Sequence, residues 1–226
     1  MSTGPPPGGP VEERLAAWLS QMSEVGPARA AAVSALHHLG RADQTAYDAV
    51  AGWSSPALDV PLRELSRFAN FSKPWLLVAV CLAATGPAGR RAALTGVAAI
   101  GVTSLLVNQP MKLVGDRRRP DRQRSHVPRR RWVRMPTSTS FPSGHSASAA
   151  AFAVAVGDSL PVLGPPLRAA AATVAFSRVY TGVHFPGDVL VGGAVGVIVG
   201  RLTSRTVSHL TAGNPLVPAH PDAQTP

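Results

Sequence analysis

Five apolar segments after residue 72 constrain the fold of this chain more than any other feature. The second of them, Ala92 to Met111, has about 20 residues without a charge, enough for a helix to cross roughly 30 Å of hydrocarbon. Four shorter segments complete the set: residues 75–85, 147–163, 167–180 and 189–199. Ala, Gly and Val dominate them, and such small side chains let helices pack closely in lipid. The pattern predicts an all-α integral membrane helical bundle with four or five spanning helices.

The overall composition agrees with this class. Charged residues make up 15% of the chain and hydrophobic residues 45%, a low charge fraction for a soluble protein. A soluble, Ala-rich helical protein is the alternative, and the segment pattern favours the membrane.

The regions outside the apolar segments divide into tails and amphipathic helices. Residues 1–10 and 212–226 are rich in Pro, Gly and polar residues, so we expect both to be disordered. Residues 11–56 form an expected N-terminal helical region, followed by a domain over residues 57–205. Two amphipathic helices are predicted before the first span, with apolar residues three or four apart. Their apolar positions are Leu15, Trp18, Leu19 and Met22 in the first, and Leu58, Leu62, Leu65 and Phe68 in the second.

Positive charge is concentrated in one loop between the second and third apolar segments. The formal net charge is +10. Ten of the cations fall in this loop: Lys112, Arg117, Arg118, Arg119, Arg122, Arg124, Arg129, Arg130, Arg131 and Arg134. Trp132 is the only aromatic ring among them, so a base-stacking platform for nucleic acid is missing. Phosphate chemistry and anionic lipid headgroups explain the cluster as well as nucleic-acid binding does. We therefore expect no nucleic-acid partner.

Three short motifs in the second half of the chain carry the chemistry. Lys112 to Pro120 reads K-L-V-G-D-R-R-R-P, Pro142 to His145 reads P-S-G-H, and Ser177 to Asp188 reads S-R-V-Y-T-G-V-H-F-P-G-D. Apart from Asp116 in the first motif, they supply cations, two histidines, the carboxylate of Asp188 and a Ser-Gly turn. These groups suit holding a phosphate and attacking it with a histidine. Counting membrane crossings places the basic loop and the third motif on the same side.

The third motif pairs a histidine with a carboxylate. His184 and Asp188 are four residues apart, so they share one face of a helix, and Pro186 suits its first turn. The helix therefore begins around Phe185 or Pro186. Asp188 can then accept a proton from one nitrogen of His184 and leave the other as a nucleophile. In the alternative interpretation, His184 caps the helix and Asp188 favours its N-terminal dipole.

The other two motifs add groups that suit a phosphate. Ser143 is the expected N-cap of the third segment, Gly144 lets the backbone approach a phosphoryl oxygen, and His145 lies in the first turn. Lys112 and Arg119 are seven apart, which on a local helix would point both one way. We expect the remaining cations nearby, Arg117 and Arg118, to contact headgroups or solvent.

The three motifs together resemble the type 2 phosphatidic acid phosphatase family, which includes lipid diphosphate phosphatases and vanadium haloperoxidases. The family pattern is K-x6-R-P, then P-S-G-H, then S-R-x5-H-x3-D, and every fixed position is matched. The resemblance implies that His184 attacks phosphorus to form a phosphohistidine. It also implies that His145 is the general acid and then the general base, and that Asp188 orients His184. The phosphate-binding residues implied are Lys112, Arg119, Ser143, Gly144 and Arg178.

The sequence therefore predicts a membrane lipid phosphatase that hydrolyses a lipid phosphomonoester or diphosphate. We expect no metal and no cofactor, since one carboxylate is too few for a two-metal phosphatase. A vanadium-dependent haloperoxidase and a non-catalytic lipid-binding membrane protein are the alternatives. Which lipid phosphate is used and the oligomeric state stay open.

Two arguments disagree on the side of the membrane that the site faces. The basic loop outweighs the arginines expected on the opposite side, so the positive-inside rule favours the cytoplasm. Resemblance to bacterial polyprenyl diphosphate phosphatases favours the outside. We expect a multi-pass protein of the plasma membrane with an extracytoplasmic site.

Overall fold

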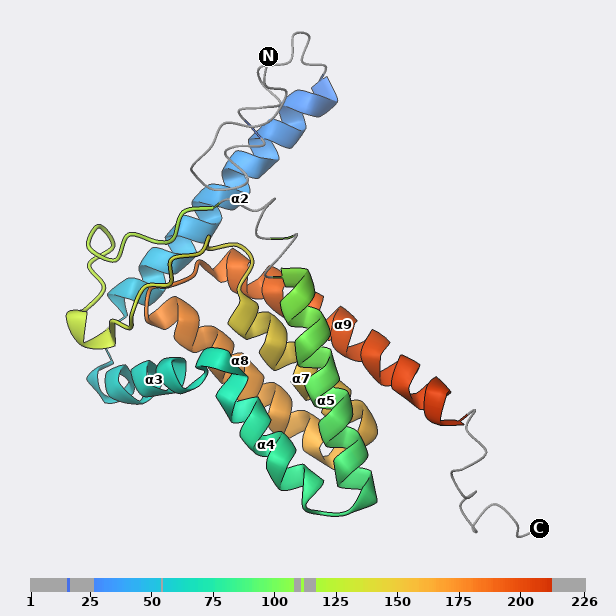
Figure 1. Ribbon diagram of the computed structural model, residues 1–226. Helices are drawn as coiled ribbons and strands as arrows, with labels where there is room; N and C mark the ends of the chain where they lie inside the picture. The colour runs from blue at the N-terminus through green and yellow to red at the C-terminus, as the bar shows by residue number, and fades with distance from the viewer. Residues whose placement is uncertain (1–15, 17–26, 54, 108–110, 112–116, 213–226) are drawn as a thin grey trace.

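The computed structural model describes residues 16, 27–53, 55–107, 111 and 117–212, and within these residues the chain is helical without strands (Figure 1). The expected disordered tails and the amphipathic helix around residues 15–22 fall almost wholly outside the described residues. The α-helices are α2 (Pro27–Gly52), α3 (Pro56–Phe68), α4 (Lys73–Ala83), α5 (Pro87–Leu106), α7 (Gly144–Ser159), α8 (Gly164–Tyr180) and α9 (Pro186–Ala212). Short 3-10 turns are η1 (Asn70–Ser72), η3 (Arg129–Arg131) and η4 (Pro161–Leu163).

Prolines and one serine set where these helices begin. A proline stands in the first or second position of α3, α4, α5 and α8, where its missing N–H has no intrahelical partner to lose. Helix α9 begins at Pro186, which confirms the predicted start. Ser143 is the N-cap of α7, and its side chain accepts from the backbone N–H of Ser146, which confirms the predicted cap.

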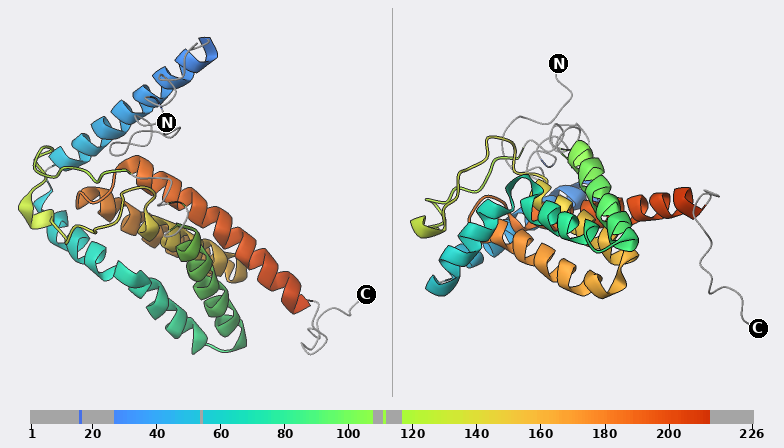
Figure 2. Two further views of the ribbon diagram at one scale, coloured as in Figure 1. Left: turned by 45° about the horizontal axis from the view of Figure 1, so that its top comes forward. Right: turned by 60° about the horizontal axis from the view of Figure 1, so that its bottom comes forward.

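Helix α7 lies at the centre of the bundle, and α4, α5, α8 and α9 surround it (Figures 1 and 2). Its Ala149, Phe152 and Val156 are fully buried in a core with Trp75 of α4 and Val174 of α8. Burial on every side requires a helix that is apolar all round, and the Ala-rich third segment has that composition.

Glycines on one face of α9 set its distance from α7. A Cβ atom added at Gly192, Gly196 or Gly200 would lie 2.4, 2.2 and 2.7 Å, respectively, from backbone carbonyl oxygens of α7 and its N-cap. The repeat of one glycine every four residues therefore brings the two backbones into direct contact, as small residues do in membrane helix pairs. One turn before Gly192, the carbonyl of Asp188 accepts from the N–H of Ser143 at 3.0 Å. Close packing thus joins the starts of the two helices that carry the second and third motifs.

Large apolar side chains face outward from the bundle. They lie on α4, α5 and α9 and include Leu77, Val80, Leu94, Leu105, Leu190 and Ile198. Such an exposed apolar surface suits lipid contact. By length and hydropathy, the segment Pro186–Thr211 has the character of a membrane span among the described residues. All five predicted segments form helices, but the number of four or five spans is not confirmed. Helix α4 has 11 residues, and α5 starts with two arginines near its first turn.

One end of the bundle gathers the starts of α4, α7 and α9 and the ends of α5 and α8 (Figure 1). This arrangement places the basic loop and the third motif together at one end of the bundle. The predicted amphipathic helix is present as α3, and two residues of its apolar face, Leu58 and Phe68, are exposed. The face that α3 buries consists of Asp59, Leu62 and Ser66, since polar partners in the loop and α8 require polar residues opposite them.

Candidate active site

His184 lies in the short loop between α8 and α9. Gly182 adopts a φ of +70° there, a left-handed conformation that suits glycine. A side chain at this position would also meet Arg122 and Tyr47 at 2.9 Å. The turn brings His184 back over the first turn of α9. There, 3% of the surface of His184 is exposed.

The imidazole of His184 is held between an acid and a guanidinium. Its Nδ1 lies 3.5 Å from Asp188 Oδ2, and its Nε2 lies 3.3 Å from Arg119 Nη1. A guanidinium can only donate, so the arrangement fits a neutral ring with its hydrogen on Nδ1 and its lone pair on Nε2. Burial lowers the pKa of His184 to about 4, with Arg119 acting in the same direction and Asp188 opposing. The ring is therefore neutral near pH 7.

Several donors fix the carboxylate of Asp188. Arg117 Nη1 donates to Oδ1 at 2.9 Å, while the hydroxyl of Ser140 and the backbone N–H of Phe185 donate to Oδ2. Sequence reasoning missed Ser140 and assigned Arg117 to headgroup or solvent contact, which is wrong because Arg117 is only 3% exposed. Nothing in a run of three arginines marks the one that faces inward.

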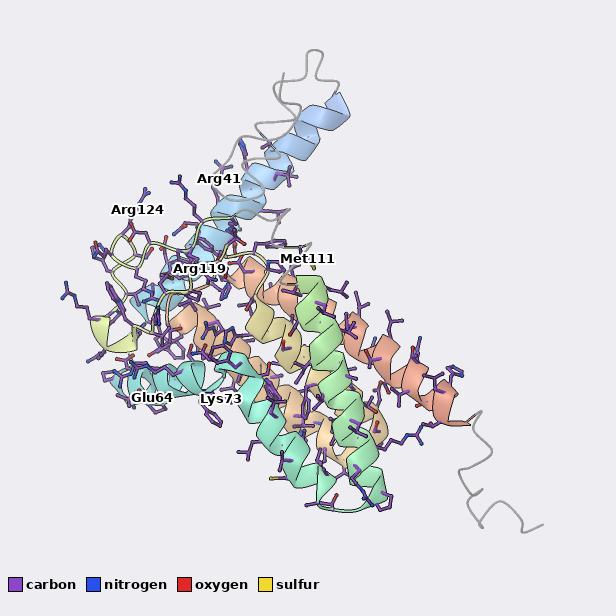
Figure 3. All side chains as sticks on the ribbon, viewed as in Figure 1. Arg41, Glu64, Lys73, Met111, Arg119 and Arg124 are labelled. Atoms are coloured by element: carbon purple, nitrogen blue, oxygen red, sulfur yellow. The ribbon has the colours of Figure 1, made fainter. Side chains whose placement is uncertain are left out.

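Arg119 lies in the basic loop (Figure 3) and contacts His184. Its guanidinium donates to the carbonyls of Val183 at 2.7 Å, Ser138 at 2.9 Å and Thr139 at 3.1 Å. Burial lowers its pKa to about 10, so it is a cation at neutral pH. Residues 117–120 are not helical. The local helix expected to align Lys112 with Arg119 therefore does not extend to Arg119. Lys112 itself lies outside the described residues.

His145 occupies the first turn of α7 and is half-buried. Its Nε2 lies 3.0 Å from Asn70 Oδ1, a distance that fits a hydrogen bond donated by the ring. Asn70 opens the η1 turn, where Phe71 and Ser72 both have a φ of 57°. Non-glycine residues at such angles are uncommon and mark a constrained junction. Sequence reasoning missed Asn70, because a lone asparagine between two apolar stretches carries no signal.

A cavity of about 500 Å³ opens between these groups. Arg119, Gly144, His145 and His184 line its polar part. Its apolar part includes Ala69, Phe71, Trp75, Leu76 and Ile100. The cavity therefore has a cationic and histidine-bearing floor next to an apolar wall from α4 and α5, a combination that suits an amphiphile with an anionic head.

Two predicted phosphate ligands, Ser143 and Arg178, lie outside the lining of this cavity. Ser143 is fully buried, and its Oγ accepts from the hydroxyl of Ser146 at 2.9 Å. Arg178 is 1% exposed, and its Nη1 donates to the carbonyl and hydroxyl oxygens of Ser66 at 2.9 and 2.6 Å. The roles of both in phosphate binding stay predictions.

Other arginines of the basic loop fasten it to the bundle. Arg122 donates to the carbonyls of Gly182 at 3.1 Å and Val133 at 2.8 Å. Arg131 donates to Asp59 at 2.6 Å and lies 4.1 Å from the centre of the Tyr180 ring. Both arginines are buried, so part of the charge that seemed available for phosphate or lipid is structural.

The described side chains do not include a group of three or more His, Cys, Asp or Glu residues that could hold a metal ion. The groups that meet at the cavity are a neutral histidine with an oriented lone pair, a cation beside it and a second histidine. This arrangement can perform nucleophilic attack on an anionic centre and proton transfer to a leaving group.

Comparison with known families and relatives agrees with this chemistry. The family model of the PAP2 superfamily matches residues 92–212. Decaprenylphosphoryl-5-phosphoribose phosphatase from Mycobacterium tuberculosis is 36% identical over 152 residues, which cover 65% of this chain and 79% of the relative. The protein of the same name from Mycolicibacterium smegmatis is 34% identical over 140 residues, which cover 61% of this chain and 72% of the relative.

Solved structures share the fold. The chain is similar to a transmembrane PAP2 type phosphatidylglycerolphosphate phosphatase from Bacillus subtilis, with a TM-score of 0.61 and 24% identity over 81% of this chain and 92% of that one. LpxE from Aquifex aeolicus matches with a TM-score of 0.54 and 23% identity, over 70% of this chain and 92% of that one.

Proposed function

This chain belongs to the PAP2 superfamily, and we propose that it hydrolyses a lipid phosphomonoester or diphosphate through a phosphohistidine on His184. One observation carries the proposal. The Nε2 atom of a buried, neutral His184 accepts from Arg119 beside a cavity that also contains His145. A nucleophile, a cation for the phosphoryl oxygens and a proton donor therefore share one site.

The reaction proceeds in two displacements. Nε2 of His184 attacks phosphorus, the bond from phosphorus to the leaving oxygen breaks, and His145 donates a proton to that oxygen. Asp188 stabilises the positive charge that the imidazole gains. Water then attacks the phosphohistidine, His145 accepts a proton from it, and the bond between phosphorus and nitrogen breaks. Inorganic phosphate leaves and His184 is restored.

The cavity and the relatives support a lipid as the alcohol part of the substrate. Its apolar wall suits a hydrocarbon chain, and its polar floor suits a phosphate. The mycobacterial relatives are phosphatases of a decaprenyl-linked sugar phosphate, so we propose a polyprenyl-linked or similar lipid phosphate. The haloperoxidase alternative is not favoured, because the relatives are phosphatases.

A phosphate-release screen tests this function. Purified protein in detergent is given a panel of polyprenyl phosphates and diphosphates, phosphatidic acid and phosphatidylglycerol phosphate. We expect release from at least one lipid, no effect of EDTA, and inhibition by vanadate in the phosphate site. Activity that EDTA abolishes and Mg²⁺ restores contradicts the metal-free mechanism. Bromination with vanadate and peroxide in place of phosphate release would support a haloperoxidase.

We also propose that α4, α5, α7, α8 and α9 all cross the membrane and that the site faces outward. The outward apolar side chains of α4, α5 and α9 support the crossings. Thiol labelling in intact cells tests the direction, after Cys81 is replaced by Ala. A cysteine at exposed Gln123, beside the site, should react with an impermeant reagent, and one at exposed Ala88, at the opposite end, should not. The reverse pattern places the site in the cytoplasm.

A further inference from the structure

Helix α2 contributes a carboxylate to the back of the site. We infer that Asp43 is a positioning residue that acts on Asp188 through Arg117, an inference that rests on the proposed function of His184 and Asp188. Helix α2 lies outside the residues matched by the family model, and its C-terminal half reaches the end of the bundle where the site lies (Figure 1).

The two carboxylate oxygens of Asp43 contact two different neighbours of Asp188. Its Oδ2 lies 2.8 Å from Arg117 Nη2, and the other nitrogen of that guanidinium, Nη1, lies 2.9 Å from Asp188 Oδ1. Its Oδ1 accepts from the backbone N–H of Gly187 at 2.7 Å. Asp43 therefore contacts both the cation bound to Asp188 and the backbone N–H of the residue before Asp188.

The surroundings keep this chain of contacts in place. Arg117 is 3% exposed and Asp188 is fully buried, so their interaction is poorly screened by solvent. Phe185 packs against the guanidinium of Arg117 at 4.0 Å. Tyr47, one turn after Asp43 on α2, packs against the same ring at 5.4 Å. A Cβ atom at residue 187 would lie 2.9 Å from Asp43 Oδ2, so the approach of α2 depends on glycine there.

The charges explain why this contact affects the reaction. Asp43, Arg117 and Asp188 together carry one net negative charge behind His184, and the attacking imidazole becomes positive. Arg117 without Asp43 would cancel the charge of Asp188 at the moment when it is needed. The carboxylate on α2 thus lets Arg117 orient Asp188 without neutralising the group as a whole.

Asp43→Asn tests the inference, because it removes the charge and keeps the size and an oxygen for Gly187. The matched control is Asp48→Asn, the same change on an exposed residue of the same helix. We expect Asp43→Asn to lower kcat about tenfold, within the range of couplings in ion-pair networks. KM and inhibition by vanadate should stay unchanged, because Arg119 and the cavity are not altered.

A double-mutant cycle tests the route through Arg117. If Asp43 acts through Arg117, Asp43→Asn in an Arg117→Met background should cause no further fall in kcat. Equal kcat for Asp43→Asn and Asp48→Asn, fully additive losses in the cycle, or a rise in KM with unchanged kcat would each overturn the inference. If Asp43→Asn does not fold, the kcat of Asp43→Glu is measured in its place. A kcat of Asp43→Glu as low as that of Arg117→Met would count against the role of Asp43.

Failure of this inference is distinguishable from failure of the proposed function. A wild-type protein that releases no phosphate from any lipid tested contradicts the function itself. A wild-type protein that is active, with inactive His184→Ala and normal Asp43→Asn, leaves the function standing and removes only the role of Asp43.

Discussion

The two histidines of the site have different surroundings. His184 is almost fully buried. Its partner Asp188 accepts from Arg117 and Ser140, and its partner Arg119 donates to the carbonyl of Val183. His145 is half-buried at the cavity, and Asn70 lies at its Nε2. A nucleophile gains from a fixed lone pair in a dry environment. A group that gives a proton to one oxygen and takes one from water needs access to both.

The largest effect expected from this comparison is that of His184→Ala. It removes the only proposed nucleophile, so we expect kcat to fall at least about 100-fold while the fold persists. Phosphate release from a lipid phosphate in detergent measures it, with exposed His209→Ala as the control. Retention of more than about a tenth of the activity would show that His184 is not the nucleophile.

The His145→Ala variant should lose less activity on a substrate whose leaving group needs no proton. With a lipid alcohol as the leaving group we expect a loss of about 100-fold. With an aryl phosphate, whose phenolate leaves more easily, the loss should be much smaller. Parallel rates on the two substrate classes measure the difference. An equal loss on both would contradict the role of His145 as the general acid.

The acid limb of the pH profile should report the burial of His184. Its pKa is lowered to about 4, and protonation takes away the Nε2 lone pair, so kcat/KM should fall as the pH drops through about 4 instead of about 6.5. NMR titration of ¹⁵N-labelled imidazoles, assigned with His184→Ala, measures the pKa directly. A His184 pKa near 6.5 would show that the ring is not kept neutral by burial.

The smallest effect expected is that of Asn70→Ala, which removes a hydrogen-bond partner of His145. One such bond contributes about 1 kcal/mol, so we expect kcat to fall roughly fivefold with an unchanged KM. Steady-state kinetics on a lipid phosphate measure both constants. A rate equal to that of wild type would show that His145 is oriented by other contacts.

Spacing along the chain predicted the local parts of this architecture. The five apolar segments became α4, α5, α7, α8 and α9, because their length and small side chains allow few other structures. Ser143 caps α7, and Pro186 opens α9. The pairing of His184 with Asp188 was predicted as well, but the turn before α9 brings it about, because His184 precedes the helix and Asp188 lies in its first turn.

Which arginines of the basic loop turn inward depends on the folded arrangement of the helices. Arg117, Arg118 and Arg119 are adjacent and chemically identical, yet the first pairs with the carboxylates of Asp43 and Asp188, the second is exposed and the third faces the cavity. Their partners lie some 65 to 75 residues away in sequence, so no local pattern can identify them. Local patterns in the chain were enough to predict the helices of the bundle, the Ser143 cap and the motif residues. Packing decided the rest, because the burial of a charge depends on what the other helices bring opposite it.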